Sequence, residues 1–345
     1  MALTAPLIEN AQSLCSHVVH ANLAGQHLRI AADDKSVADH FRRRLGCHVA
    51  RRSSREVVGQ GAALTSPENA LACGLMDAPE HEDLDRELVF RVPSTNCVAA
   101  ISLPQRAVAL AALAPNVDRY WFVDYLAEIV PGLLLGDEVV TLHAAAVAGP
   151  QGAVALVGEP ASGKTTLAAC VAQTAAGCFL ADDKLLLARD AHAMVHAHPF
   201  YMDLHFDRRT IELVPGLAER AVMTRRGQDI TGNLRTRDRQ EADEYRMAIT
   251  DLWPDWKPVT APMQAVVFPR LVPGRAVSRL APLSPSRSWS LLAAHVLPFL
   301  GDHWPSIIER DRRVLRSLVS QCRCYRLYLG SDVAEAANRI LEIAQ

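Results

Sequence analysis

Apolar runs of strand length alternate with helix-compatible runs in the middle of the chain. Residues 139–148 and 153–157 are apolar enough for buried strands, and turn residues 149–152 stand between them. Residues 166–173 are rich in alanine and contain no glycine or proline, which favours a helix. Residues 177–181 form the next apolar run. The pattern therefore predicts a pair of adjacent strands, then a loop and a helix, and then another strand.

The rest of the chain has the same mixed pattern and divides into two regions. Residues 27–45 predict a strand followed by a helix, and a polar, acidic stretch over 77–86 precedes further strand-like runs. An amphipathic run over 121–135 predicts the helix that introduces the second region. Later elements are expected as a strand over 262–271, a helix over 286–295 and a closing helix over 332–344. We therefore predict an α/β protein with a smaller N-terminal α/β recognition domain over residues 1–115 and a larger domain over 116–345.

Residues 158–165 form a glycine-bearing loop between the second predicted strand and the helix. They read Gly-Glu-Pro-Ala-Ser-Gly-Lys-Thr, which fills every fixed position of the phosphate-binding (P-loop) pattern G-x-x-x-x-G-K-[ST]. The glycines let backbone amides curl around a phosphate, and the helix N-terminus adds partial positive charge. Lys164 is expected to reach the β- and γ-phosphate oxygens, and the Thr165 hydroxyl to bind Mg²⁺. The residues expected to bind the nucleotide are Gly158, Ser162, Gly163, Lys164, Thr165 and Thr166.

Two carboxylates, Asp182 and Asp183, directly follow the predicted strand over 177–181. Because this strand comes only one helix after the loop, the carboxylates are expected beside the bound triphosphate. One can hold Mg²⁺ directly or through water, and the other can accept the proton of an attacking hydroxyl; the sequence leaves open which does which. The alternative is a solvated turn, which the preceding loop and apolar strand disfavour.

His143 interrupts the apolar run over 139–148. Its imidazole must either find a buried partner or face a cleft at the strand end. Taken alone, a single histidine in an apolar stretch is more typical of a core residue with a hydrogen-bond partner than of a catalytic group.

The three blocks 143–147, 158–165 and 180–183 together resemble the HPr kinase/phosphorylase superfamily in order and spacing. The resemblance implies a P-loop-containing core like that of HPr kinase and phosphoenolpyruvate carboxykinase, with ATP and Mg²⁺ at one end of a mixed sheet. It implies that His143 lies near the Asp182–Asp183 pair, that one aspartate is the base and that an aspartate binds the metal with Thr165. Lys164 completes the expected catalytic set. The resemblance also implies a homo-oligomer.

The chain departs from true HPr kinases after the acidic pair. Their second signature, a Glu-Ile-Arg-Gly-like segment, has no convincing copy here, and residues 220–239 are instead polar, interrupted by glycine and rich in arginine. HPr is therefore disfavoured as the acceptor, and so is the reverse phosphorolysis reaction. The sequence looks more like the wider group of HPr-kinase-like proteins, some of which phosphorylate serine hydroxyls of peptides, including lasso-peptide precursors, or free amino acids.

The arginines after the acidic pair have two interpretations. Guanidinium groups suit the charge on a transferring phosphoryl group and recognise carboxylates or phosphates, whereas the interleaved acidic residues equally fit a solvated loop. A lid that orders when substrate binds would satisfy both. Tyr201, Asp203 and His205 are expected to border the acceptor pocket. The arginine candidates are Arg225, Arg226, Arg235, Arg237 and Arg239.

A transition-metal site is disfavoured. His192, His196, His198 and His205 are closely spaced, but residues 184–198 predict two strands around a turn, and no cysteine or glutamate completes a ligand set. The eight cysteines are expected to be mostly buried thiols. Two of them, Cys322 and Cys324, lie in an alternating strand-like run without a second cysteine pair for zinc.

Composition and net charge indicate the size of the core and the expected location of the protein. With 345 residues, 50% of them hydrophobic and 21% charged, the chain can bury one large core or two modest ones. A net charge of −2 gives no global attraction to nucleic acid or membranes. No secretory signal or membrane-spanning run is expected, so we predict a cytoplasmic protein.

The expected function is an ATP- and Mg²⁺-dependent kinase that phosphorylates a hydroxyl, with a serine of a peptide or protein as the favoured acceptor. Two alternatives stay open: a kinase of a free small metabolite or amino acid, and a nucleotide-binding regulatory protein. The long region before the loop disfavours metabolite kinases of the shikimate or adenylate type. The intact Lys164, Thr165 and acidic pair disfavour a purely regulatory role.

Overall fold

A computed structural model describes residues 4–45, 49–50, 57–78, 81–83, 87–91, 96–114, 135–174, 177–200, 203–214, 216–217, 244–257, 259–296 and 305–344. Backbone contacts divide the chain into two compact units. The first comprises Met1–Thr141 and Pro298–Arg313, and the second comprises Leu142–Leu297 and Val314–Gln345. The boundary expected at residue 115 lies outside the described residues, as does the helix expected over 121–135 except for its last residue.

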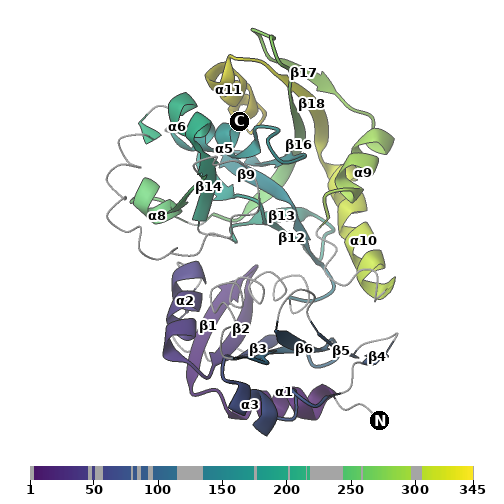
Figure 1. The fold of residues 1–345 in the computed structure, drawn as a ribbon. Coiled ribbons are helices and arrows are strands. Elements are labelled where there is room, and N and C mark those ends of the chain that lie inside the picture. The colour runs from purple at the N-terminus through teal and green to yellow at the C-terminus, as the bar shows by residue number, and fades with distance from the viewer. Residues whose placement is uncertain are drawn as a thin grey trace. The chain divides into compact units, whose positions relative to one another are not determined.

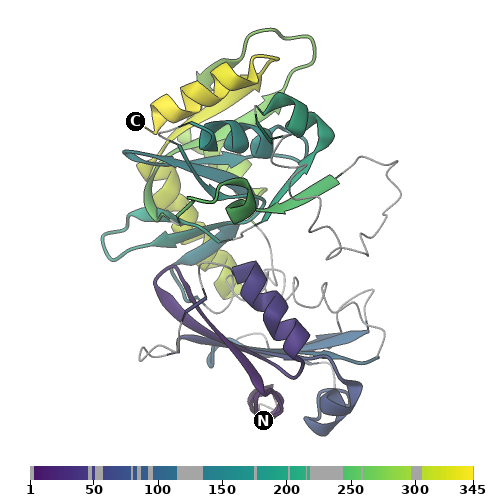
Figure 2. The ribbon, with the colours of Figure 1, turned by 90° about the vertical axis from the view of Figure 1, so that its left-hand side faces the viewer.

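The first unit is built on a mixed seven-stranded sheet in the order β1-β2-β3-β7-β6-β5-β4 (Figure 1). The pairs β2–β3 and β3–β7 are parallel and the other recorded pairs are antiparallel. Helices α1 and α3 lie on one side of the sheet and α2 on the other (Figures 1 and 2). The elements are β1 (His17–Leu23), β2 (Gln26–Ala32), β3 (Gly59–Leu64), β4 (His81–Asp83), β5 (Glu87–Arg91), β6 (Cys97–Ser102), β7 (Ala107–Ala112), α1 (Thr4–Ser13), α2 (Lys35–Leu45) and α3 (Pro67–Ala72).

The second unit is built on a mixed nine-stranded sheet, of whose last strand, β8, only Leu142 belongs to this unit. Its order is β11-β9-β10-β16-β13-β12-β8, and β18 joins β16 to β17. The pairs β10–β16 and β16–β18 are parallel, whereas β9–β10, β9–β11 and β17–β18 are antiparallel. The strands are β8 (Val139–Leu142), β9 (Ala144–Gly149), β10 (Gly152–Val157), β11 (Cys178–Ala181), β12 (Leu185–Arg189), β13 (Val195–His198), β16 (Ala261–Leu271), β17 (Arg279–Pro282) and β18 (Arg323–Leu329). The protein is therefore mixed α/β, as the sequence predicted.

Helices cover this sheet and a separate two-stranded ribbon adjoins it. Strands β14 (Asp203–Asp207) and β15 (Glu244–Ala248) pair antiparallel, and Asp207 caps α6 by accepting a hydrogen bond from the Thr210 backbone at 2.8 Å. Figure 2 shows α5 (teal) beside α11 (yellow). The helices are α5 (Lys164–Ala172), α6 (Arg208–Leu213), α8 (Ile249–Leu252), α9 (Pro285–Ala293) and α11 (Val333–Ile343). Helix α10 (Pro305–Gln321) belongs to this unit only from Val314 onward.

Alternate residues of the central strands form the core under α5 and α11. Leu156 of β10, Val267 of β16 and Leu327 of β18 are fully buried in one cluster with Leu167 of α5 and Ile340 of α11. Because side chains alternate across a strand, the intervening residues face the opposite side of the sheet. Burying each of these leucine or valine side chains contributes about 1.5–3 kcal/mol, which holds the end of β10 and the start of α5 in place.

Several predicted elements are confirmed, and one is corrected. The hairpin around 149–152, the pair of strands within 184–198, the strand near 262–271 and the last two predicted helices are all present. The run 139–148, however, is two strands rather than one, because the chain bends at His143 between β8 and β9. There the backbone N–H of His143 donates to the carbonyl of His295 at 2.8 Å instead of to a neighbouring strand of the sheet.

Candidate functional site

The loop 158–163 turns tightly between the end of β10 at Val157 and the start of α5 at Lys164. Ala161 and Gly163 both have left-handed backbone conformations, with φ of 60° and 95°. The N–H of Ser162 donates to the Glu159 carbonyl at 3.2 Å, which closes a turn inside the loop. The chain therefore enters α5 directly from a compact loop, and the helix N-terminus points at the space the loop surrounds.

Both fixed glycines of the loop lie where a side chain would not fit easily. A Cβ on Gly158 would lie 2.9 Å from the Ser162 Oγ and 3.3 Å from the Pro269 carbonyl oxygen. A Cβ on Gly163 would lie 2.7 Å from the Cδ2 of Leu329. The hydroxyl oxygen of Ser162 is buried and, among the described residues, has no hydrogen-bond partner. The loop thus combines close backbone approach with one buried polar atom that a bound group could satisfy.

Gly163→Ala is expected to lower the free energy of unfolding by about 1–2 kcal/mol, because alanine is strained at the left-handed φ of residue 163. Displacing the Leu329 side chain adds to this loss. Gly274→Ala is the matched control, because Gly274 has a φ of 76° but a Cβ added there would have no atom within 4 Å. Urea unfolding of both variants should give the larger loss for Gly163→Ala. Equal losses would show that the contact with Leu329 does not constrain the loop.

Lys164 bends back over its own loop. Its Nζ donates to the carbonyl oxygens of Gly158 at 2.7 Å and Glu159 at 3.1 Å. Burial lowers the pKa of the Lys164 ammonium, and the nearby charges of Asp183, Asp182 and Glu159 act in the opposite direction. The lysine is 5% exposed, so its amino group is held inside the loop with three acidic side chains nearby.

The acidic strand β11 ends next to the loop threonine. Asp182 is 2% exposed, and its Oδ1 accepts a hydrogen bond from the Thr165 Oγ1 at 2.7 Å. Asp183 has a left-handed φ of 59°, and the N–H of Lys184 donates to the Asp182 carbonyl at 2.6 Å. This tight turn sends the two successive carboxylates in different directions. The structure therefore brings Thr165 and Asp182 together, and that they share a metal ion stays a prediction.

His143 contacts the second carboxylate of the pair. Its Nε2 lies 3.5 Å from the Asp183 Oδ1, and the two side chains are 28% and 50% exposed. The bend between β8 and β9 places the imidazole at a partly exposed carboxylate. His143 is therefore not the core histidine that its apolar surroundings alone favoured, and it lies near the acidic pair, as the family resemblance implied. His143, Lys164, Thr165 and the two aspartates come from three segments and form one cluster.

A second histidine, His295, joins this cluster and was not predicted from the sequence. Its ring centre lies 6.2 Å from that of His143, and its Nε2 lies 3.9 Å from the Oε1 of Glu159. Burial lowers the pKa of His295; Glu159 opposes this, while His143 and Lys164 lower the pKa further. No local pattern marks His295, because it follows α9 and reaches the loop only through the fold.

The structure describes the contacts of Thr166 but not those of the predicted acceptor residues. The Oγ1 of Thr166 lies 2.9 Å from the Oγ1 of Thr210, which donates to Asp207 at 2.9 Å, so Thr166 links α5 to α6. His205 pairs with Arg246 in the β14–β15 ribbon, and Asp203 starts that ribbon. The side chains of His205 and Asp203 are outside the described atoms, as are Tyr201, Arg225, Arg226, Arg235, Arg237 and Arg239 entirely.

The side-chain oxygens of Thr165 and Asp182 are ligands of the kind that Mg²⁺ binds. Mg²⁺ prefers oxygen ligands and commonly takes only one or two from the protein, with the rest from phosphates and water. In the described ranges, no group of three or more His, Cys, Asp and Glu side chains is placed to hold a metal ion. Two of the clustered histidines have other neighbours: His196 lies 3.1 Å from Asp190, and the His198 Nδ1 lies 3.1 Å from the Thr260 hydroxyl.

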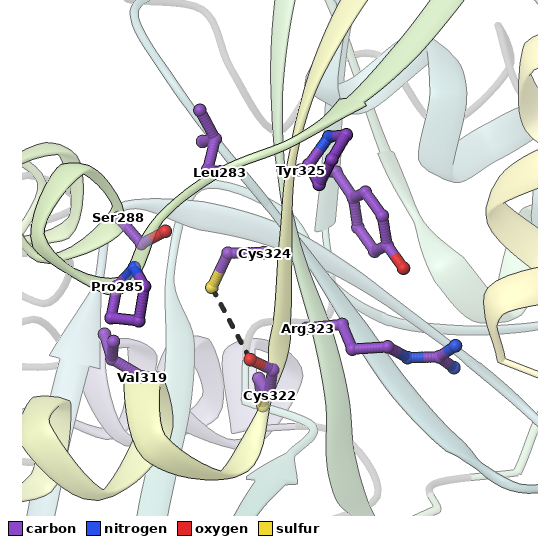
Figure 3. A pocket seen from close by; sticks show the side chains of 9 residues that line it. Leu283, Pro285, Ser288, Val319, Cys322, Arg323, Cys324 and Tyr325 are labelled. Atoms are coloured by element: carbon purple, nitrogen blue, oxygen red, sulfur yellow. Dashed lines mark hydrogen bonds between the residues drawn. The ribbon is translucent and has the colours of Figure 1, made fainter.

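A cavity of about 310 Å³ lies between α9, the end of α10 and the start of β18 (Figure 3). Its lining includes Pro285 and Ser288 of α9, Val319 of α10, Cys322 between α10 and β18, and Cys324 of β18. Because β18 runs parallel to β10, its start lies at the sheet edge opposite the loop. Burial raises the pKa of both thiols, so they stay protonated near neutral pH. The cavity is therefore separate from the candidate site.

Neither family models nor curated sequences identify a relative of this chain. A scan against protein-family models gave no match, and a search of curated proteins found no matching sequence. Within the described parts of the chain, no helix is both long and apolar enough to span a membrane.

Proposed function

We propose that the protein is an ATP- and Mg²⁺-dependent kinase of the HPr-kinase-like type that phosphorylates a hydroxyl of a peptide or protein, with serine as the favoured acceptor. The observation that carries the proposal is the hydrogen bond of 2.7 Å from the Thr165 hydroxyl to Asp182. It joins a loop of phosphate-binding sequence to the carboxylate of the adjacent strand. A phosphate loop beside a buried carboxylate is what a nucleoside triphosphate with Mg²⁺ requires.

In the proposed reaction the loop residues bind ATP, the phosphate donor, and neutralise its charge. Lys164 would exchange its two carbonyl contacts for the β- and γ-phosphate oxygens, and the backbone amides at the start of α5 would donate to the same phosphates. Thr165 and Asp182 would hold Mg²⁺, which supplies positive charge that neutralises the phosphates. Asp182 is the better metal ligand of the pair, because it is buried against Thr165.

Asp183 is the better candidate for the base. Its side chain is half-exposed, so an acceptor hydroxyl can reach it, and the His143 Nε2 lies 3.5 Å from its Oδ1. The acceptor oxygen would form a bond to the γ-phosphorus while the bond from that phosphorus to the β–γ bridging oxygen breaks, and Asp183 would take the acceptor proton. His143 would orient the Asp183 carboxylate and modulate its basicity, so it acts as a positioning residue.

The test is phosphorylation itself. A serine-containing peptide incubated with the protein, ATP and Mg²⁺ should gain one phosphoryl group. Phosphate found only on a free amino acid or metabolite would make the protein a small-molecule kinase. Nucleotide binding without any transfer would support a regulatory protein instead.

A further inference from the structure

Positive charge gathers in one segment of the second unit. In the sequence no aspartate or glutamate stands between Asp255 and Asp302, although the whole chain has a net charge of −2. The basic residues in this interval are Lys257, Arg270, Arg275, Arg279 and Arg287. The segment includes β16, β17 and α9, which lie next to β18 in the fold (Figure 1).

The strand register aligns three arginines on one face of this part of the sheet. Arg270 of β16 is the partner of Tyr328 of β18, and Tyr328 is on its other side the partner of Arg279 of β17. Arg326 precedes Tyr328 by two positions on β18, so its side chain leaves the strand on the same side. We call Arg270, Arg279 and Arg326 the arginine row.

The arginine row faces away from the core of the second unit. Leu327 and Leu329, which alternate with Arg326 and Tyr328, are buried in the cluster under α5 and α11. The row therefore lies on the opposite face, where α9 contacts β18. There the guanidinium carbon of Arg326 lies 5.8 Å from the ring centre of Phe268, its partner on β16, which fixes this arginine against the sheet.

Among the residues whose side chains are described, no carboxylate balances the row. None of its three arginines makes an ion pair within this set, and Arg270 and Arg279 are exposed. Partial burial lowers the pKa of Arg326, and the positive charges of Arg287 and Arg270 lower it further, against the effect of Tyr328. Like charges thus stand close together without compensation, which favours an anionic ligand.

The row begins beside the phosphate loop. The carbonyl oxygen of Pro269 lies 3.3 Å from the position that a Cβ on Gly158 would take, and Arg270 is the next residue. A segment bound along the row would therefore lie at the same sheet edge as the candidate site. Neighbouring strands are about 4.8 Å apart, so a row across three strands spans roughly 10 Å. That length exceeds one carboxylate and matches a short chain that bears several.

We propose that the arginine row binds an acidic segment of the peptide or protein acceptor and holds it next to the phosphate loop. This inference rests on the proposed kinase function for the identity of the ligand. Arginine forks pair with carboxylates in a two-point geometry, so glutamate and aspartate side chains of an extended peptide suit the row. Nucleic acid is a poorer occupant, because a chain of net charge −2 lacks the broad positive field that many phosphate contacts need.

The test is direct binding, measured without ATP. A fluorescein-labelled peptide of alternating glutamate and glycine around one serine is titrated with the full-length protein, and its anisotropy is followed. The same peptide with glutamine for glutamate is the uncharged reference. We expect the glutamate peptide alone to bind, and Arg270→Gln/Arg326→Gln to weaken its binding roughly 10-fold or more.

The matched control removes the same charge elsewhere. Arg323→Gln lies on β18 but on the opposite face from Arg326, and Arg209→Gln lies on α6, which contacts α5 in the same unit; both arginines are exposed. This double variant should bind the glutamate peptide within about two-fold of the unaltered protein, since exposed charges at a distance are screened. An equal loss in both double variants would mean a general charge effect and would overturn the proposal. So would equal binding of the two peptides, or tighter binding of a single-stranded oligonucleotide that displaces the glutamate peptide.

A single variant and thermal unfolding distinguish a loss of peptide binding from a loss of folding. Arg270→Gln alone, at an exposed strand end, should weaken binding without affecting the Arg326–Phe268 contact, and thermal unfolding reports whether each variant folds. Because the assay contains no ATP, peptide binding that depends on the row stands even if no phosphate transfer is found. Transfer that is unaffected by loss of the row, with no change in KM for the glutamate peptide, would overturn the proposal while leaving the kinase function intact.

Discussion

The double variant Asp182→Asn/Asp183→Asn is expected to transfer phosphate at least about 1,000-fold more slowly than the unaltered protein, while it still binds ATP measurably. General-base catalysis contributes about 10²–10⁴-fold, and this variant also removes the carboxylate at the proposed metal site. Asparagine suits both positions, because it keeps the side-chain volume and tolerates the left-handed φ of 59° at Asp183. The measurement compares the rate of phosphopeptide formation with the affinity for a fluorescent ATP analogue.

Asp251→Asn/Asp255→Asn is the matched control for the loss of two negative charges. Both aspartates are exposed and belong to the same unit, in or just after α8. This variant should transfer phosphate within about two-fold of the unaltered protein, because exposed charges away from the site are screened by salt. If transfer survives in the variant of Asp182 and Asp183, neither aspartate is the base and the proposed mechanism is wrong.

Lys164→Met should lower kcat by about 10²–10³-fold, the loss typical when one preorganised positive or hydrogen-bonding group is removed from a charged transition state. Methionine keeps the unbranched, apolar part of the side chain, which is 5% exposed, but it cannot donate to the Gly158 and Glu159 carbonyls or to a phosphate. Affinity for ATP should fall less than kcat if the lysine acts mainly on the transferring phosphoryl group.

Lys257→Met provides the comparison for Lys164. Lys257 is exposed, and its replacement removes the same charge from the same unit. The control should keep its turnover, and steady-state kinetics of both variants at saturating ATP give the comparison. Equal turnover in Lys164→Met and the unaltered protein would remove the lysine from the mechanism, and with it the case for a phosphate-binding loop.

The local part of the site could be predicted because its signals are contiguous in sequence. Gly158, Gly163, Lys164 and Thr165 lie in one motif, and the flanking strand and helix have clear hydrophobic patterns. The acidic pair follows one short helix later, and a compact α/β arrangement leaves few places for it other than beside the loop. The hydrogen bond from Thr165 to Asp182 agrees with that reasoning.

The non-local part could not be predicted, because it depends on contacts between distant segments. His143 was expected at the site only through the family resemblance; its own apolar surroundings favoured the core, and the bend that exposes it appears only in the fold. His295 reaches the same cluster from the end of α9. The arginine row depends on the register between β16, β17 and β18, which sets Arg270, Arg279 and Arg326 on one face. A shift of one residue would place them on opposite faces.

The most direct test of the central claim is the mass of the acceptor after incubation of the purified protein with ATP and Mg²⁺. Serine-containing peptides, with and without glutamates, and a pool of free amino acids and hydroxy metabolites are offered together, and Asp182→Asn/Asp183→Asn serves as the inactive reference. The account predicts one added phosphoryl group on a peptide serine with the unaltered protein, and none with the reference. Phosphate on no acceptor, or equal phosphate with both proteins, would contradict it.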